Sequence, residues 1–73
     1  MTSQDDGLIV KLVQGLNAPD QMTRKNAVGA LRLHGKRAAG TIPAIAQLLD
    51  RERDPQVQAE AQRALQHLQQ YVA

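Results

Sequence analysis

Residues 23–31, TRKNAVGAL, and residues 57–65, VQAEAQRAL, share an alanine, two further residues and then Ala-Leu, at a spacing of 34. Alanine, leucine, arginine and glutamine are good helix formers, so both segments are predicted to be helical. The segments before them match at a spacing of 33, which aligns Ile9 with Ile42. Self-similarity at such a period is typical of stacked helical hairpins.

The repeat predicts one all-α domain over residues 1–73, made of two stacked antiparallel helical hairpins at about residues 8–35 and 41–69. The chain has no Phe or Trp and a single Tyr, so the core must be aliphatic. Turn and cap residues place the predicted helices at about residues 5–17, 21–34, 41–50 and 55–70. The residues that mark these boundaries are Asp20, Thr41 and Asp54 as N-caps, Pro43 and Pro55 in first turns, and Gly35 as a left-handed helix stop.

Several of these segments resemble the HEAT-repeat family, in particular its short bacterial, phycobilisome-lyase-type repeats, over about residues 8–69. The residues that carry the resemblance are Leu48-Leu49-Asp50, Asp54-Pro55-Gln56-Val57, Ala61-Gln62-Arg63-Ala64-Leu65, Gly35 and Ile42-Pro43-Ala44-Ile45. The resemblance implies a partial ladder of ion pairs, with Arg24 bound to Asp50, while Asn17 and Gln58 replace the other members. It also implies that the second and fourth helices line a concave face.

Positive charge is concentrated in the middle of the chain, although the net charge is only +2. Residues 24–37 contain five cations and no acid, namely Arg24, Lys25, Arg32, Lys36 and Arg37. A cationic ridge of this kind would suit nucleic-acid phosphates. The alternative is an ordinary surface in which Arg24 pairs with Asp50, and Lys36 and Arg37 interact with the negative C-terminal end of the helix predicted at about residues 21–34. No aromatic residues are interleaved, which disfavours single-strand binding.

Glutamine dominates the last helix: five of the ten Gln residues lie between residues 58 and 70. Gln58, Gln62 and Gln66 either form a polar surface that binds a partner without the cost of desolvating charge, or a plain soluble helix face. The sequence leaves both interpretations open.

Metal and catalytic sites find little support in the composition. The chain has no cysteine and only two histidines, His34 and His67, in different predicted helices, so zinc ligands are scarce. No phosphate-binding loop or hydrolase motif occurs. We therefore expect no enzyme activity, cofactor or metal. The absence of a signal peptide or a long apolar run predicts a cytoplasmic, non-membrane protein.

The sequence as a whole predicts a non-catalytic protein-interaction module, an adaptor or assembly factor that binds a partner protein through its inner helices. The expected partner-binding residues are Arg24, Lys25, Arg32, Lys36, Arg37, Gln58, Gln62 and Gln66, and the expected structural residues are Arg24, Asp50, Gly35, Pro43, Asp54 and Pro55. The alternative is a nucleic-acid-binding module that uses residues 24–37. Because two hairpins are fewer than such arrays usually need, a second copy, a partner or the tail at residues 71–73 is expected to cover an apolar flank.

Overall fold

A computed structural model describes residues 4–72 of the chain, which are mostly helical and contain no strand. The elements are α1 (Gln4–Gly15), α2 (Gln21–His34), the 3-10 helix η1 (Gly35–Thr41), α3 (Ile42–Arg51) and α4 (Pro55–Gln69). The predicted all-α class is confirmed. The predicted helix bounds agree with the observed ones to within two residues, but the expected turn after Gly35 is a 3-10 helix.

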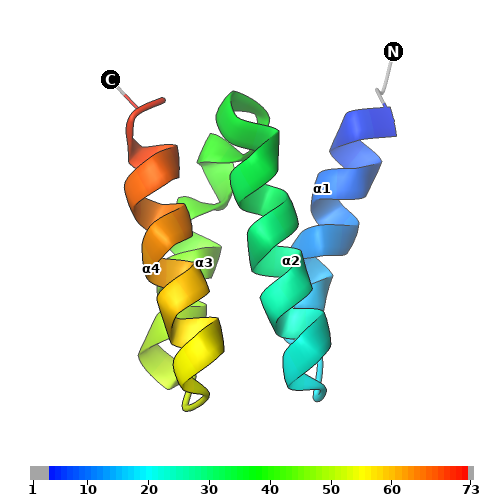
Figure 1. Cartoon of the computed structure of the whole chain (residues 1–73). Coiled ribbons are helices and arrows are strands. Elements are labelled where there is room, and N and C mark those ends of the chain that lie inside the picture. The colour runs from blue at the N-terminus through cyan, green and yellow to red at the C-terminus, as the bar shows by residue number, and fades with distance from the viewer. Residues whose placement is uncertain (1–3, 73) are drawn as a thin grey trace.

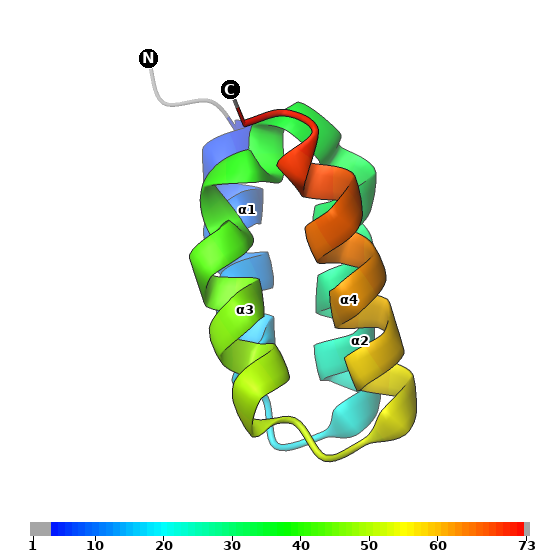
Figure 2. The same ribbon diagram turned by 90° about the vertical axis from the view of Figure 1, so that its left-hand side faces the viewer.

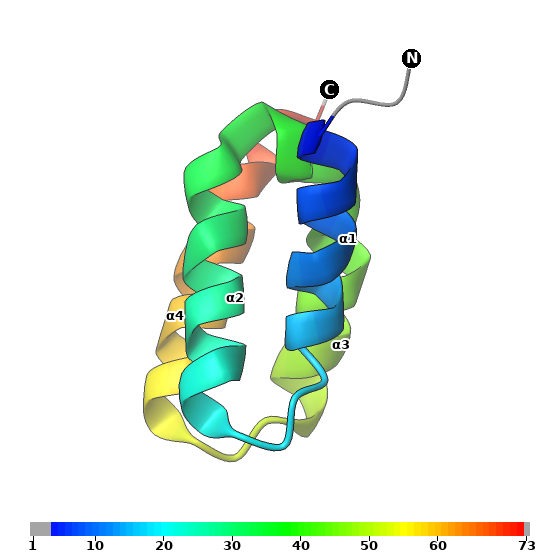
Figure 3. The same ribbon diagram turned by 90° about the vertical axis from the view of Figure 1, so that its right-hand side faces the viewer.

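The helices form two layers (Figure 1). Viewed from either side, α1 and α3 lie together in one layer and α2 and α4 in the other (Figures 2 and 3). The 3-10 helix η1 crosses from α2 to α3 at the end of the molecule where α1 begins and α4 ends. The turns at residues 16–20 and 52–54 lie together at the opposite end.

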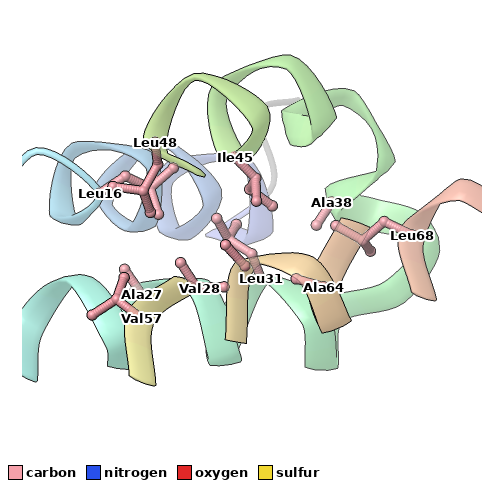
Figure 4. Close-up of a cluster of buried hydrophobic side chains, with 11 residues drawn as sticks. Leu16, Ala27, Val28, Leu31, Ala38, Ile45, Leu48, Val57, Ala64 and Leu68 are labelled. Carbon is pink, nitrogen blue, oxygen red and sulfur yellow. The ribbon is translucent and has the colours of Figure 1, made fainter. Parts of the chain in front are cut away.

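The core lies between these two layers and is entirely aliphatic (Figure 4). Leu16, Ile45 and Leu48 point from the α1/α3 layer toward the side chains of α2 and α4. Alanines at the positions of the repeat let the helices approach closely, because a methyl group takes little space between two backbones. The buried apolar residues are Leu16, Ala27, Val28, Leu31, Ala38, Ile45, Leu48, Val57, Ala61, Ala64 and Leu68.

Side-chain caps begin the two helices of the second layer, as predicted. The Asp20 carboxylate accepts a hydrogen bond from the Thr23 amide at 2.9 Å, and the Asp54 carboxylate accepts from the amides of Gln56 and Val57 at 2.9 and 3.0 Å. Each cap satisfies amides that have no partner inside the helix.

Thr41 precedes α3, as expected, but the prediction that its side chain caps the helix is wrong. The buried Thr41 hydroxyl donates to the Ala38 carbonyl oxygen at 2.6 Å instead. The competing acceptor is close because η1 coils the chain immediately before α3. Pro43 lies in the first turn of α3, where a missing amide costs nothing.

Gly35 ends α2 with φ +59° and ψ −124°, and it is the only residue in the described part of the chain with a positive φ. Its amide donates to the Arg32 carbonyl oxygen. A Cβ atom at this position would lie 3.3 Å from the Tyr71 hydroxyl oxygen. The backbone conformation therefore favours glycine here, and a methyl group would also make a tight contact with Tyr71.

We predict that Gly35→Ala lowers the free energy of unfolding by ~1–3 kcal/mol, because alanine is strained at this backbone conformation and its methyl group would press on Tyr71. Urea denaturation followed by circular dichroism measures the change. Gly7→Ala is the matched control: a Cβ at Gly7 meets nothing within 4 Å, so alanine there should leave stability unchanged or raise it. Equal effects of the two substitutions would contradict the prediction.

Candidate functional site

The first charged site joins the two turns at one end of the molecule. Arg24, in the first turn of α2, binds Glu52 through two parallel hydrogen bonds, Nε to Oε1 at 2.8 Å and Nη2 to Oε2 at 3.0 Å. Arg24 Nη1 also donates to the carbonyl oxygens of Ala18 and Pro19, each at 2.9 Å. One guanidinium therefore holds the turn of the first hairpin and the turn of the second.

The Glu52 side chain is only 3% exposed, and its carboxylate accepts hydrogen bonds from two residues. Besides Arg24, the Asp54 amide donates to Glu52 Oε2 at 3.1 Å. The Gln58 side-chain amide donates to the Glu52 carbonyl oxygen at 2.7 Å. Gln58, expected to bind a partner, thus contributes to the fold at this position.

The expected pair of Arg24 with Asp50 is wrong. Asp50 is exposed on α3. The backbone becomes extended at Glu52, with φ −76° and ψ 134°, and the Glu52 carboxylate is the one that is buried. Asn17, aligned with Asp50 by the repeat, accepts a hydrogen bond from Arg51 of the second hairpin. Glu52 falls in the linker between the helices predicted at about residues 41–50 and 55–70, and an acid between two arginines carries no mark of burial.

Hydrogen bonding determines the ionisation of this pair. The Arg24 guanidinium lowers the pKa of Glu52, the Asp54 and Arg53 amides lower it further, and burial opposes them. The bond to Glu52 raises the pKa of Arg24. Both groups therefore carry their charges at neutral pH.

We predict that Glu52→Gln lowers the free energy of unfolding by about 2 kcal/mol at pH 7, because Arg24 loses a charged acceptor. The folded pKa of Glu52 lies below the unfolded value of 4.5. The pair therefore stabilises the fold above that pH and its contribution is lost as the pH falls through the folded pKa. Urea denaturation between pH 7 and pH 3 should show the difference between wild type and variant shrinking with acid.

Asp50→Asn is the control for this prediction, since it removes an exposed carboxylate two residues away. We expect a change within about 0.5 kcal/mol. A larger loss for Asp50→Asn than for Glu52→Gln would restore the pairing that the sequence suggested.

An open hollow of about 630 Å³ lies over these turns, lined by residues 16–18, Gln21, Arg24 and residues 51–55. The Arg24 guanidinium and the Glu52 carboxylate in its wall bind each other and neighbouring backbone. The hollow is thus bounded by groups that hold the turns together.

The second charged site lies between α2 and α4. Glu60 of α4 accepts from Arg32 Nε of α2 at 3.1 Å and from Arg63 Nη1, one turn along α4, at 3.5 Å. The Glu60 side chain is 13% exposed. Gly29 of α2 lies beside it, and a Cβ there would be in ordinary contact with Glu60 Oε1 at 3.6 Å. Arg32, which was expected to bind a partner, is thus engaged with Glu60, and neither Glu60 nor Arg63 was predicted as a site residue.

The five cations of residues 24–37 do not form one ridge. Arg24 and Arg32 belong to separate ion pairs, Lys25 is half-buried, and Lys36 and Arg37 are exposed on η1 at the far end of α2. Lys25 and Lys36 are 11 residues apart, roughly 16 Å along a helix. Gln62 and Gln66 are exposed on α4.

A family model for HEAT repeats matches residues 9–73. The chain belongs to the HEAT-repeat family. HEAT repeats commonly mediate interactions between proteins and are generally not catalytic. No curated protein and no solved structure matches the chain closely enough to count as a relative.

Two further observations bear on the range of functions. None of the helices in the described part of the chain is long and apolar enough to cross a membrane. Within the same residues, no group of three or more His, Cys, Asp or Glu side chains comes together as a set of metal ligands. His67 instead contacts Gln70 and the edge of the Tyr71 ring.

Proposed function

We propose that this HEAT-repeat chain is a non-catalytic adaptor or assembly factor, built as two stacked hairpins, that binds an acidic segment of a partner protein between α2 and α4. The observation that carries the proposal is the cluster of Arg32, Glu60 and Arg63, in which two guanidinium groups share one carboxylate. This cluster leaves a surplus positive charge on the surface between the two helices.

The cluster is suited to a carboxylate because its donors are already positioned. Arg32 donates its Nε–H to Glu60 and Arg63 donates an Nη1–H, whereas each guanidinium has five N–H groups. The remaining donors can bind a second carboxylate side by side, which is the geometry that arginine favours. Since Glu60 holds both side chains in place, less conformational entropy is lost on binding.

We also propose a cytoplasmic location, which agrees with a chain that has no cysteine. The turn and helix motifs of the repeats support the proposal that they are of the bacterial, phycobilisome-lyase type. Lys25, Gln62 and Gln66, on α2 and α4, are proposed as further contacts with the partner.

We predict that Arg32→Gln with Arg63→Gln reduces capture of a partner protein at least tenfold while the chain stays folded. Tagged wild-type and variant proteins are used to capture proteins from a lysate of the source cells, and mass spectrometry compares the amounts. The control is Lys11→Gln with Arg53→Gln, which removes the same charge from exposed positions outside this cluster. A set of captured proteins that responds equally to both double variants would contradict the proposal.

Nucleic-acid binding through residues 24–37 is the weaker alternative, because ion pairs with Glu52 and Glu60 already engage Arg24 and Arg32. We predict that the chain does not bind duplex DNA even at 20 mM salt, a condition that strengthens phosphate contacts. Fluorescence anisotropy of a labelled duplex measures this. Binding at low salt that falls steeply toward 150 mM, and that Lys36→Ala with Arg37→Ala weakens, would replace the adaptor proposal.

A further inference from the structure

An uncharged, exposed stripe runs along the side of α2 opposite the core. Met22 and Leu33 are 55% and 79% exposed. Asn26 is exposed between them, with the half-buried Ala30 beside it. The spacing of 4, 4 and 3 residues from Met22 through Asn26 and Ala30 to Leu33 places them on one face of a helix.

The C-terminal tail does not cover this stripe. Tyr71 packs against Gly35 and the ring of His67 instead, and Ala73 lies outside the described residues. Leu33 keeps most of its surface in contact with solvent. The stripe is therefore an unpartnered helix face in the described chain.

The stripe on α2 corresponds, through the repeat, to the side of α4 that packs against α2. The position of Asn26 corresponds, 34 residues on, to Glu60, which reaches back to Arg32 on the preceding inner helix. Likewise the fully buried Ala64 corresponds to the half-buried Ala30. The side of α4 that packs against α2 is therefore covered, whereas the equivalent side of α2 is left open.

The two candidate surfaces for covering the stripe differ in chemistry. The outer side of α4, which a head-to-tail copy would present, carries an exposed glutamine, Gln62, at the position equivalent to the buried Val28. The stripe itself has a large apolar residue at each end and small residues between them. When two copies are related by a two-fold axis, the large residues of one stripe meet those of the other, and the small residues in the middle meet as well. The two α2 helices can then approach closely, and the assembly closes as a dimer.

The charges at the two ends of α2 favour an antiparallel orientation of the paired helices. Asp20 is exposed at the N-terminus of α2, and Lys36 is exposed just beyond its C-terminus. In an antiparallel pair Met22 faces Leu33 of the second copy, and Asp20 faces Lys36 at each end. A parallel pair would instead place like charges and like helix-dipole ends together.

We propose that two copies of this chain associate through an antiparallel pair of α2 helices, with Met22 and Leu33 of one copy against Leu33 and Met22 of the other. The interaction is independent of the Arg32–Glu60–Arg63 cluster. It makes the adaptor bivalent, because each copy keeps its own charged cluster.

Cysteine cross-linking tests the register, since the chain has no cysteine of its own. Met22→Cys and Leu33→Cys chains, tagged differently and mixed under mild oxidation, should form a disulfide-linked heterodimer at least tenfold faster than either chain links to itself. Val10→Cys, an exposed apolar position on α1, is the control and should not cross-link to either. Faster self-linking of Leu33→Cys would overturn the antiparallel arrangement, and equal rates for all combinations would overturn the interface.

Sedimentation velocity between 5 and 500 µM tests the association itself. We expect a concentration-dependent dimer that Leu33→Glu weakens at least tenfold and that Val10→Glu leaves unchanged; both positions are exposed, so both variants keep the circular dichroism of the wild type. A monomer at 500 µM, or equal weakening by the two variants, would overturn the proposal. Arg32→Gln with Arg63→Gln should still dimerise, so failure here is distinguishable from failure of the partner-binding proposal.

Discussion

The ion pair between Arg24 and Glu52 is the interaction on which the relative placement of the two hairpins depends. Through it, the Arg24 side chain binds the turn at residues 16–20 and the turn at residues 52–54 at the same time. Burial would make an isolated carboxylate costly. Two guanidinium bonds and the Asp54 amide offset that cost and keep Glu52 ionised. The geometry is therefore specific, because few other arrangements satisfy all these groups.

The aliphatic core stabilises the fold but specifies little about how the helices are arranged. Its members are leucine, isoleucine, valine and alanine, which pack in many ways at similar energy. Contacts at both ends restrict those choices: the Arg24–Glu52 ion pair at the turns, and the packing of Tyr71 against Gly35 at the opposite end. With so small a core, these end contacts decide which of the compact arrangements is adopted.

The surface divides into parts with different contacts. At the turns, Arg24, Glu52 and Gln58 are engaged in holding the fold together. Between α2 and α4, Glu60 organises two arginines, whose remaining donors form the proposed site for an acidic partner. Along the far side of α2, Met22 and Leu33 form the uncharged face that we propose contacts a second copy. If both proposals hold, the dimer binds a multivalent partner more tightly than a single copy does, since the second contact is intramolecular.

Much of the fold could be predicted from the sequence because its signals are local. Asp20 and Asp54 act on amides two or three residues away, and Gly35 answers a backbone requirement of its own position. The prediction for Thr41 was wrong in its contact, because the η1 helix, which no local pattern indicated, brought a nearer acceptor. The aliphatic character of the core was likewise predicted, since the chain has no Phe or Trp and a single Tyr.

The sequence by itself determined the α-helices, their boundaries to within two residues, the repeat and the aliphatic core. Only the tertiary structure decided which charges meet: Arg24 with Glu52 rather than Asp50, Arg51 with Asn17, and Glu60 with Arg32. Those partners lie 28 to 34 residues apart. Charged side chains are long and can reach several partners, so the choice among them depends on the angle at which the chain leaves α3 and on the packing of α2 against α4.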